Sequence, residues 1–376
     1  MLYADYNSTT PPLVDVVAAV TAAMTEDWGN PGARQHVQGR RATALVDRAR
    51  ASVAAIIGAH DDEVVLTSGA TEALNQAILG VGERLLATRP RVVAPATEHH
   101  AVLAPLERLA AAGAQVVLVP VDAQGRVDPR QLATAIDERT ALVCAMAGNN
   151  ETGVRHEVAA IAALAHARGA LLLCDATQAI GKVPVDAPAW GCDLLALSGH
   201  KVYGPGGTGA LWIRRGLGIP PLLYGGGQEH GRRSGTPHVA GLAGLAVALE
   251  LARAALPVRT VHLTALTTRL EDRLTAALPR LHIAGAGAGR LPGTSMITLP
   301  GLRRGWLGTL TGVAASGGSA CASASGEPSH VLLAMGQSPL DAGNSLRLSL
   351  GLPTTLAEVD RIADAVIQGA RRLGAA

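Results

Sequence analysis

The sequence predicts an α/β fold in which a mostly parallel sheet is flanked by helices and followed by a smaller α+β domain. Between about residues 43 and 256, short continuous apolar runs alternate with segments of helical periodicity. Such runs are typical of strands buried on both faces, and the helices between them are the usual crossovers of a parallel sheet. Beyond about residue 257 the pattern changes to one long helical segment and scattered short strands, which predicts a second domain.

Six apolar runs are the predicted strands of the large sheet. In chain order they are EVVLTS (63–68), RVVAPA (91–96), AQVVLVP (114–120), ALVCAMA (141–147), ALLLCDA (170–176) and DLLALS (193–198). Ligands of such sheets bind at the carboxyl ends of the strands. The first run leads into a small-residue turn that opens a helix at Thr71 and Glu72. Backbone N–H groups and the helix dipole at such a start can hold a phosphate.

The C-terminal region has its own predicted elements. They are a helix over about 258–278, strands near 281–284, 295–299 and 345–350, and a final helix. Thr355 and Glu358 open that last helix with the spacing of a capping box. We therefore expect three units: an N-terminal segment 1–15 that packs with the small domain, a large domain 16–256 and a small domain 257–376.

Composition limits the possible functions. A formal charge of +2 without a basic run, and 2% aromatic residues, give no indication of nucleic-acid binding. No apolar run approaches the roughly 18 residues of a membrane helix, and the N-terminus resembles no targeting peptide. Cys144, Cys174, Cys192 and Cys321 form no C-x-x-C pair, so neither a metal site nor a disulfide framework is expected, and the first three are predicted core residues. We expect a cytoplasmic protein that binds small molecules.

Lysine is almost absent from the chain, and one of its occurrences lies in a motif. Lys182 and Lys201 are the two lysines among 32 Lys and Arg residues. A guanidinium cannot become the neutral amine that attacks a carbonyl or removes a proton. Lys201 directly follows the predicted strand that ends at Ser198, and Asp175 ends another. A lysine, an aspartate and a phosphate-binding helix start are the parts of a pyridoxal phosphate site.

Each of these residues taken alone could be an ordinary cap or loop residue, and two lysines could survive a compositional drift by chance. The hypothesis rests on their joint position at predicted strand ends and helix starts. Lys182 is expected to be structural, because the amine chemistry needs one lysine.

The sequence resembles the cysteine desulfurases, pyridoxal phosphate enzymes of the class V aminotransferase group with the type I transferase fold. The motifs that carry the resemblance are DYNSTTPP, TSGATEALN, TEHHAV, NNETG, DATQAIGK, SGHKVYGPGGTGALW, GGGQEHGRRSGT, SGGSACASASGEPSHVLLAMG and NSLRLSLG, along nearly the whole chain. The resemblance implies conversion of L-cysteine to L-alanine, with transfer of the sulfur to acceptor proteins. These acceptors would serve iron–sulfur cluster assembly or the synthesis of thio-cofactors and thiolated tRNA.

The resemblance also implies roles around the cofactor ring. Lys201 would carry the cofactor, and Asp175 would pair with the pyridine nitrogen. Gln178 and Asn150 would address the phenolic oxygen of the ring. His99 would stack on the ring face and take part in proton transfer.

The cofactor phosphate has its own implied set of residues. By resemblance, Ala70, Thr71, Ser198 and His200 would hold it within one subunit. Thr236 of the RSGT motif would reach the phosphate of the partner subunit, which implies a homodimer.

Two residues are predicted to handle the substrate. Cys321 lies in a stretch of Ala, Gly and Ser without a large apolar residue, which predicts an accessible, mobile loop. By resemblance it attacks the substrate sulfur, and its surroundings match the long-loop branch. Arg347 lies in an alternating strand, and its guanidinium suits a carboxylate. By resemblance it binds that of the amino acid with Asn150, whereas Ser8, where the family usually has alanine, is expected to take no part.

Two alternatives remain open at this point. A selenocysteine lyase or cysteine lyase on the same fold would act without a persulfide on Cys321. A cofactor-free scaffold for sulfur-relay proteins would bind no pyridoxal phosphate and would be colourless. The sequence does not identify the sulfur acceptor.

Overall fold

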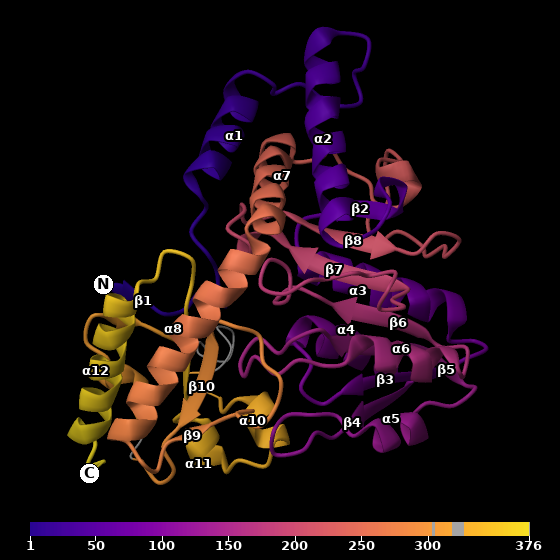
Figure 1. Cartoon of the computed structure of the whole chain (residues 1–376). Coiled ribbons are helices and arrows are strands. Elements are labelled where there is room, and N and C mark those ends of the chain that lie inside the picture. Colours follow the sequence, from indigo (N-terminus) through magenta and orange to yellow (C-terminus); the bar gives the residue numbers. More distant parts are fainter. Residues whose placement is uncertain (303–304, 318–326, 376) are drawn as a thin grey trace.

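A seven-stranded sheet forms the centre of the larger part of the molecule, in the strand order β2-β8-β7-β6-β5-β3-β4 (Figure 1). The computed structural model describes residues 1–302, 305–317 and 327–375. The strands are β2 (Val64–Thr67), β3 (Arg91–Pro95), β4 (Gln115–Val119), β5 (Thr140–Met146), β6 (Leu171–Asp175), β7 (Leu194–Ser198) and β8 (Gly209–Ile213). Neighbours from β7 across to β4 are parallel, whereas β8 is antiparallel to β7 and β2. The predicted mostly parallel sheet is confirmed.

All six predicted strands form, and β8 is a seventh that the sequence analysis did not predict. Its run GALWI follows the glycine-rich loop after Lys201, with no crossover helix between it and β7. The two strands pair as an antiparallel return in which Ser198 lies opposite Gly209. An antiparallel pair needs only a short connection. Strand β8 therefore did not fit the alternation of runs and helices on which the prediction rested.

Helices cover both faces of the sheet, and side-chain alternation along the strands creates two cores. In β6, Leu172 and Cys174 face one core, and Leu173 faces the other. The helices α2 (Val37–Ile56), α6 (Val158–His166) and α7 (Val239–Ala254) cover the first core. The second core is covered by α3 (Ala70–Leu85) and α4 (His100–Ala111). Helix α5 (Pro129–Ala135) lies between β4 and β5 in the chain. Cys144, Cys174 and Cys192 are buried, as predicted.

The C-terminal part is built on a three-stranded antiparallel sheet in the order β12-β10-β9. Its elements are α8 (Leu256–Ala277), β9 (His282–Ile283), β10 (Thr294–Thr298), α10 (His330–Ala334), α11 (Pro339–Ala342), β12 (Leu346–Ser349) and α12 (Leu356–Arg372). Leu270 of α8, Ile297 of β10 and Val359 of α12 pack in one core. The predicted long helix, the three strands and the final helix are all confirmed.

The N-terminal segment joins the C-terminal sheet before it enters the larger part. Its elements are β1 (Leu2–Tyr3), which pairs in parallel with β11 (Val313–Ala314), and α1 (Val14–Thr25), which packs on α7. Asp5 forms a β-bridge with Ser349 of β12. Five residues later the backbone N–H of Thr10 donates to the carbonyl oxygen of His200. The segment thus spans both parts, and the division into three units stays a prediction.

Helices α7 and α8 carry the chain from the larger part to the smaller one. They meet at Ala255, where the path of the chain bends by 76°. Helix α7 packs against α1 and α2, and α8 packs against α12. Among the helices of the described residues, none alone has the length and apolar composition to span a membrane, and α7 and α8 meet that test only as a bent pair.

The start of α12 gives a test of the fold. The side chain of Thr355 accepts a hydrogen bond from the Glu358 N–H at 3.2 Å, and the Glu358 carboxylate accepts one from the Thr355 N–H at 2.8 Å. This confirms the predicted capping box. We expect Thr355→Ala to lower the free energy of unfolding by about 1 kcal/mol, because a backbone donor of the first turn loses its acceptor.

Urea unfolding measures this change, and Thr275→Ala on the exposed face of α8 is its control. The control is expected to stay within about 0.5 kcal/mol of the parent. Equal effects of the two substitutions would contradict the assignment of the cap.

Candidate active site

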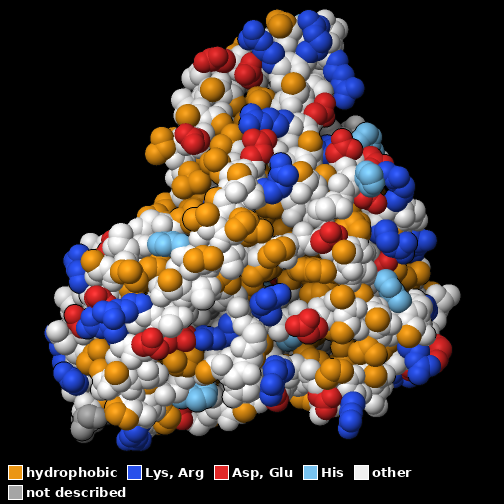
Figure 2. All heavy atoms as spheres, viewed as in Figure 1, with side chains coloured by type: hydrophobic (Ala, Val, Ile, Leu, Met, Phe, Trp, Pro, Cys, Tyr) orange, Lys and Arg blue, Asp and Glu red, His pale blue; other side chains and the backbone are white. Residues whose placement is uncertain are grey.

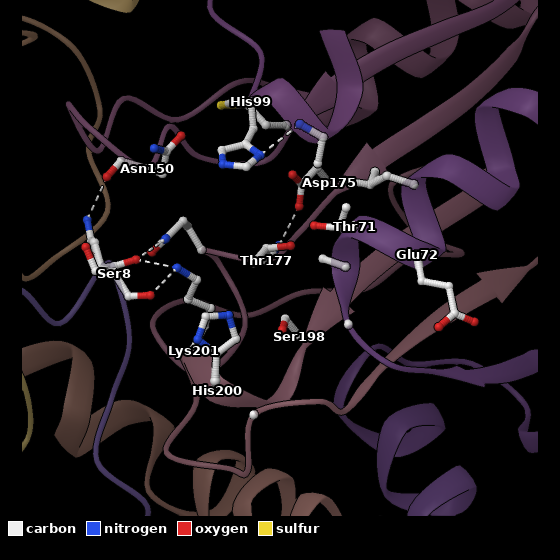
Figure 3. A pocket seen from close by; sticks show the side chains of 18 of the residues that line it. Ser8, Thr71, Glu72, His99, Asn150, Asp175, Thr177, Ser198, His200 and Lys201 are labelled. Atoms are coloured by element: carbon white, nitrogen blue, oxygen red, sulfur yellow. Dashed lines mark hydrogen bonds between the residues drawn. The ribbon is translucent and has the colours of Figure 1, made fainter. Parts of the chain in front are cut away.

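A cavity of about 450 Å³ lies at the carboxyl ends of β5, β6 and β7 (Figure 3). Met146, Asp175 and Ser198, the last residues of these strands, line it. The start of α3 and the N-terminal segment add further walls, and Arg347 reaches it from β12. Both parts of the chain therefore contribute to one site at the edge where a parallel sheet is expected to bind its ligand.

Lys201 enters the cavity from a 3₁₀ turn over Gly199–Lys201 that directly follows β7. Its Nζ donates hydrogen bonds to the carbonyl oxygens of Asn7 at 2.5 Å and Ser8 at 2.8 Å (Figure 3). Two neutral acceptors of the N-terminal segment thus hold the amine. From this position the amine can reach a carbonyl group of a ligand in the cavity.

Asp175 and His99 lie close together at the next part of the wall (Figure 3). Oδ1 of Asp175 accepts from the N–H of Thr177 at 2.9 Å. His99 caps α4, and its Nδ1 accepts from the Ala101 N–H at 3.0 Å, so the proton of the neutral ring lies on Nε2. Burial, helped by the charge of Lys201 and opposed by Asp175, lowers the pKa of His99. His99 is therefore a neutral ring with a proton to donate.

The start of α3 forms one end of the cavity. Ala70 begins the helix, and Gly69 precedes it at φ 153°, in a region that favours glycine. The backbone is packed so closely here that a Cβ on Gly209 would come within 2.6 Å of the Cα of Gly69. Thr71 and Ser198 line the cavity beside this turn. The helix N-terminus thus presents N–H donors to the cavity.

His200 lies on the same side as Lys201 and lines the cavity. Burial, followed by the charge of Lys201, lowers the pKa of His200 to about 4. A neutral ring contributes a hydrogen bond to an anion without adding a charge.

Gln178 and Asn150 both line the cavity, as the sequence analysis expected. Nε2 of Gln178 donates to the carbonyl oxygen of Asn7 at 3.0 Å. The backbone carbonyl of Asn150 accepts from Arg347 Nη1 at 3.2 Å and from Asn7 Nδ2 at 3.1 Å. The side chain of Asn150 points into the cavity (Figure 3).

Arg347 is almost completely buried and lies at the cavity beside the N-terminal segment. Its Nη2 pairs with Asp5 Oδ1 at 2.8 Å and donates to Ser8 Oγ at 2.6 Å. The sequence analysis expected no role for Ser8. The structure places its side chain on the cavity wall, in contact with Arg347, and its carbonyl in contact with Lys201.

Among the candidate residues that the structure describes, Thr236 does not line the cavity. Thr236 is exposed and lines a separate hollow of about 90 Å³, which shares Ser68 and Gly207 with the main cavity. Cys321 lies outside the described residues. Ser329 and His330, shortly after the undescribed stretch, contact residues that adjoin the cavity wall. Ser329 Oγ donates to Glu151 Oε2 at 2.5 Å, and His330 Nε2 donates to the Glu98 carbonyl at 2.9 Å.

The sequence analysis assigned no role to Asn7 or Glu98, and it expected Lys182 to be structural. Asn7 supplies an acceptor for Lys201, and Lys182 donates to the side chains of Asn7 at 2.7 Å and Gln178 at 3.0 Å. Glu98 is completely buried directly before His99. All three stand in quoted motifs, but their positions became meaningful only when distant segments were brought together.

The chain is similar to several named proteins. A family model described as aminotransferase class-V matches residues 2–362. The chain belongs to this family. It is 40% identical over 375 residues to "Cysteine desulfurase IscS" of Anaeromyxobacter sp. (strain Fw109-5), covering 99% of this chain and 93% of that protein. It is 38% identical over 375 residues to "Cysteine desulfurase" of Homo sapiens, covering 99% and 82%.

Two solved structures superpose closely on the chain. A NifS-like protein matches with a TM-score of 0.91 and 33% identity, over 98% of both chains. A structure described as SspA in complex with cysteine matches with a TM-score of 0.84 and 30% identity, over 93% of this chain and 99% of that one. The predicted fold class and family are thereby confirmed.

Class-V aminotransferases generally depend on pyridoxal phosphate. The donor set of the cavity fits this group. It combines an amine on Lys201, a carboxylate on Asp175 and the N-terminus of α3 within one cavity. These three match the aldehyde, the pyridine nitrogen and the phosphate.

Glu98 gives a prediction about pH and stability. Burial, reinforced by Asp175, raises the pKa of Glu98 to about 8, although its Oε1 accepts from the Met146 N–H at 2.7 Å. The unfolded chain releases this proton near the usual pKa of a glutamate, so the contribution of Glu98 to stability is full below that pKa and is lost as the pH rises toward 8.

We expect Glu98→Gln to remove this loss. The unfolding free energies of variant and parent are measured in urea from pH 5 to 8. The difference in favour of the variant should grow by more than about 1.4 kcal/mol over this range, because one pKa unit corresponds to that amount. A difference between the two proteins that stays constant with pH would refute the raised pKa.

Proposed function

We propose that the chain is a pyridoxal phosphate-dependent cysteine desulfurase that converts L-cysteine to L-alanine and carries the sulfur as a persulfide on Cys321. The observation that supports this most is the convergence of Lys201, Asp175 and the N-terminus of α3 on one cavity. The named relatives are cysteine desulfurases, and one structural neighbour is a complex with cysteine.

In this proposal each group of the cavity has a defined task. Pyridoxal phosphate, when bound, stores the electron pair released at the substrate Cα. The Lys201 amine removes and returns the Cα proton, and Asp175 holds the proton of the pyridine nitrogen. His99 carries its proton on Nε2 and exchanges it with the substrate. The start of α3, Thr71 and Ser198 hold the phosphate.

Arg347 and Ser8 are proposed to receive the substrate carboxylate. A guanidinium only donates, so Ser8 Oγ is the acceptor in their 2.6 Å contact and keeps its own proton to donate. A carboxylate placed here meets two donors of different residues. Asp5, which pairs with Arg347 at 2.8 Å, holds the guanidinium in place before the substrate arrives.

The sulfur step balances without an external oxidant. The thiolate of Cys321 attacks the substrate Sγ, the Cβ–Sγ bond breaks, and an S–S bond forms. Cβ takes up a proton, so cysteine becomes alanine and the Cys321 thiol becomes a persulfide. The persulfide then passes to a sulfur-acceptor protein.

We also propose that the enzyme acts as a homodimer. Val14, Val17, Met24 and Trp28 are between 51% and 83% exposed, and Figure 2 shows apolar side chains along the projecting α1. An apolar strip of this kind favours burial against another subunit. Thr236 is exposed outside the main cavity, as a residue that serves the partner's phosphate site would be.

The role of Lys201 is tested by Lys201→Arg. The variant keeps a cation but has no amine that can bond to the cofactor aldehyde. We expect it to lack the cofactor absorbance and the desulfurase activity while unfolding at a urea concentration close to that of the parent. A coloured, active variant would refute the proposal.

The role of Cys321 is tested by Cys321→Ser, with Ser323→Ala in the same stretch as the control. A serine hydroxyl is not ionised at neutral pH and is a poor nucleophile toward sulfur. We expect the cysteine-induced change of the cofactor spectrum to persist, whereas alanine and persulfide release should fall at least about a hundredfold. Alanine release at the parental rate would favour the lyase alternative.

A further inference from the structure

Lys182 is a buried amine beside the site that the proposed reaction does not use. It lies in the turn after β6, with an exposed fraction of 9%. Its Nζ donates to Asn7 Oδ1 at 2.7 Å and to Gln178 Oε1 at 3.0 Å. Thr260 of α8 binds its backbone carbonyl at 2.8 Å. Helix α8 therefore holds the backbone of Lys182, while its amine contacts Asn7 and Gln178, two residues that line the cavity.

The two contacts of Lys182 fix the orientation of both carboxamides. A lysine side chain has donors only, when it is protonated, and so each carboxamide must turn its oxygen toward it. Nε2 of Gln178 is then directed to the carbonyl of Asn7 at 3.0 Å. That same carbonyl accepts from Lys201 at 2.5 Å. The orientation of Gln178 is thereby linked to the position of Lys201.

The carboxamide of Asn7 extends this linkage to the substrate side. With its oxygen on Lys182, its Nδ2 donates to Thr294 Oγ1 at 2.9 Å and to the Asn150 carbonyl at 3.1 Å. The Asn150 carbonyl also accepts from Arg347 at 3.2 Å. One amine thus supports the acceptors of both Lys201 and Arg347.

We propose that Lys182 is a positioning residue that sets the carboxamides of Gln178 and Asn7, so that Gln178 presents its N–H₂ group to the cofactor ring. The proposal rests on the proposed function, because it assumes that pyridoxal phosphate occupies the cavity. Lys182 itself touches neither the substrate nor the reacting atoms.

Charge around Lys182 explains why an arginine does not replace it. Burial, then Lys201 and Arg347, lower the pKa of Lys182 to about 7, and its two acceptors are neutral amides. Arg259 adds a further cation nearby, with Nη1 3.4 Å from the Gly181 carbonyl. A lysine can lose its charge in such surroundings and still donate hydrogen bonds, whereas a guanidinium stays charged.

The test is a double-mutant cycle on the cofactor-loaded protein. Lys182→Met keeps the length of the side chain and removes the donor, and Gln178→Leu removes its target. We expect Lys182→Met to raise the dissociation constant of pyridoxal phosphate about tenfold, as for loss of a hydrogen bond to a charged group. In a protein that already carries Gln178→Leu, adding Lys182→Met should change the dissociation constant less than twofold. The reason is that the effects of contacting residues are not additive.

Arg259→Met is the matched control. It removes a buried cation of α8 that lies beside the turn of Lys182, and Nη1 of Arg259 donates to the carbonyl oxygen of Gly181 rather than to Asn7 or Gln178. Its effect on the dissociation constant should be small and should add to that of Gln178→Leu. Parental binding by Lys182→Met, additivity of Lys182→Met with Gln178→Leu, or an equal effect of Arg259→Met would each overturn the proposal.

A second measurement is made on the parent protein, and a variant serves only to assign its signals. The chain has two lysines, so protein labelled with ¹³C at the lysine ε-carbons gives two side-chain signals, which Lys201→Arg assigns. We expect the Lys182 signal to titrate near neutral pH and to shift when pyridoxal phosphate is added. A midpoint above about 9, closer to an ordinary lysine, or no response to the cofactor would overturn the proposal.

The experiments distinguish an error in the proposed function from an error in the role of Lys182. If the proposed function is wrong, the parent protein itself gains no cofactor absorbance when pyridoxal phosphate is added, and the inference falls with it. If only the role of Lys182 is wrong, the parent is coloured and Lys182→Met binds the cofactor as tightly as the parent does.

Discussion

The N-terminal segment is the constraint on which the geometry of the site depends. Asp5 pairs with Arg347, while the carbonyl oxygens of Asn7 and Ser8 accept hydrogen bonds from Lys201. These residues come from the first ten of the chain, whereas Arg347 belongs to the C-terminal sheet and Lys201 to the large sheet. One short stretch of backbone therefore sets the distance between the amine that would bind the cofactor and the guanidinium that would bind the substrate.

Three basic side chains lie close together in this region. Lys182, Lys201 and Arg347 lie close enough for the latter two to lower the pKa of the first. Asp5 pairs with Arg347, but the contacts of Lys182 are to neutral amides. Buried charges are costly unless they are paired, so a ligand that brings a phosphate and a carboxylate would interact favourably with these side chains. Binding and stability are then linked.

Local patterns in the sequence predicted the strands and the residues at their ends, and missed what depends on distant contacts. Asp175 was found because it ends a buried apolar run, and Lys201 because it follows such a run in a chain with two lysines, whereas the role of His99 came from the family resemblance alone. Strand β8 was missed because no helix precedes it. The contact of Ser8 with Arg347 joins residues 339 positions apart, and no local pattern encodes such a pairing. Thr236 is exposed in one chain, so a role across an interface is beyond what a single chain reveals.

The scarcity of lysine acquires a physical meaning only with both positions in view. Among 32 Lys and Arg residues, the two lysines lie in one hydrogen-bonded network, joined through Asn7. Where a cation is exposed, arginine serves equally well. At residue 201 the proposed reaction needs an amine that reacts with a carbonyl, and at residue 182 the buried, cationic surroundings favour a donor that can lose its charge. A compositional drift toward arginine would therefore leave lysine at these two positions and remove it elsewhere.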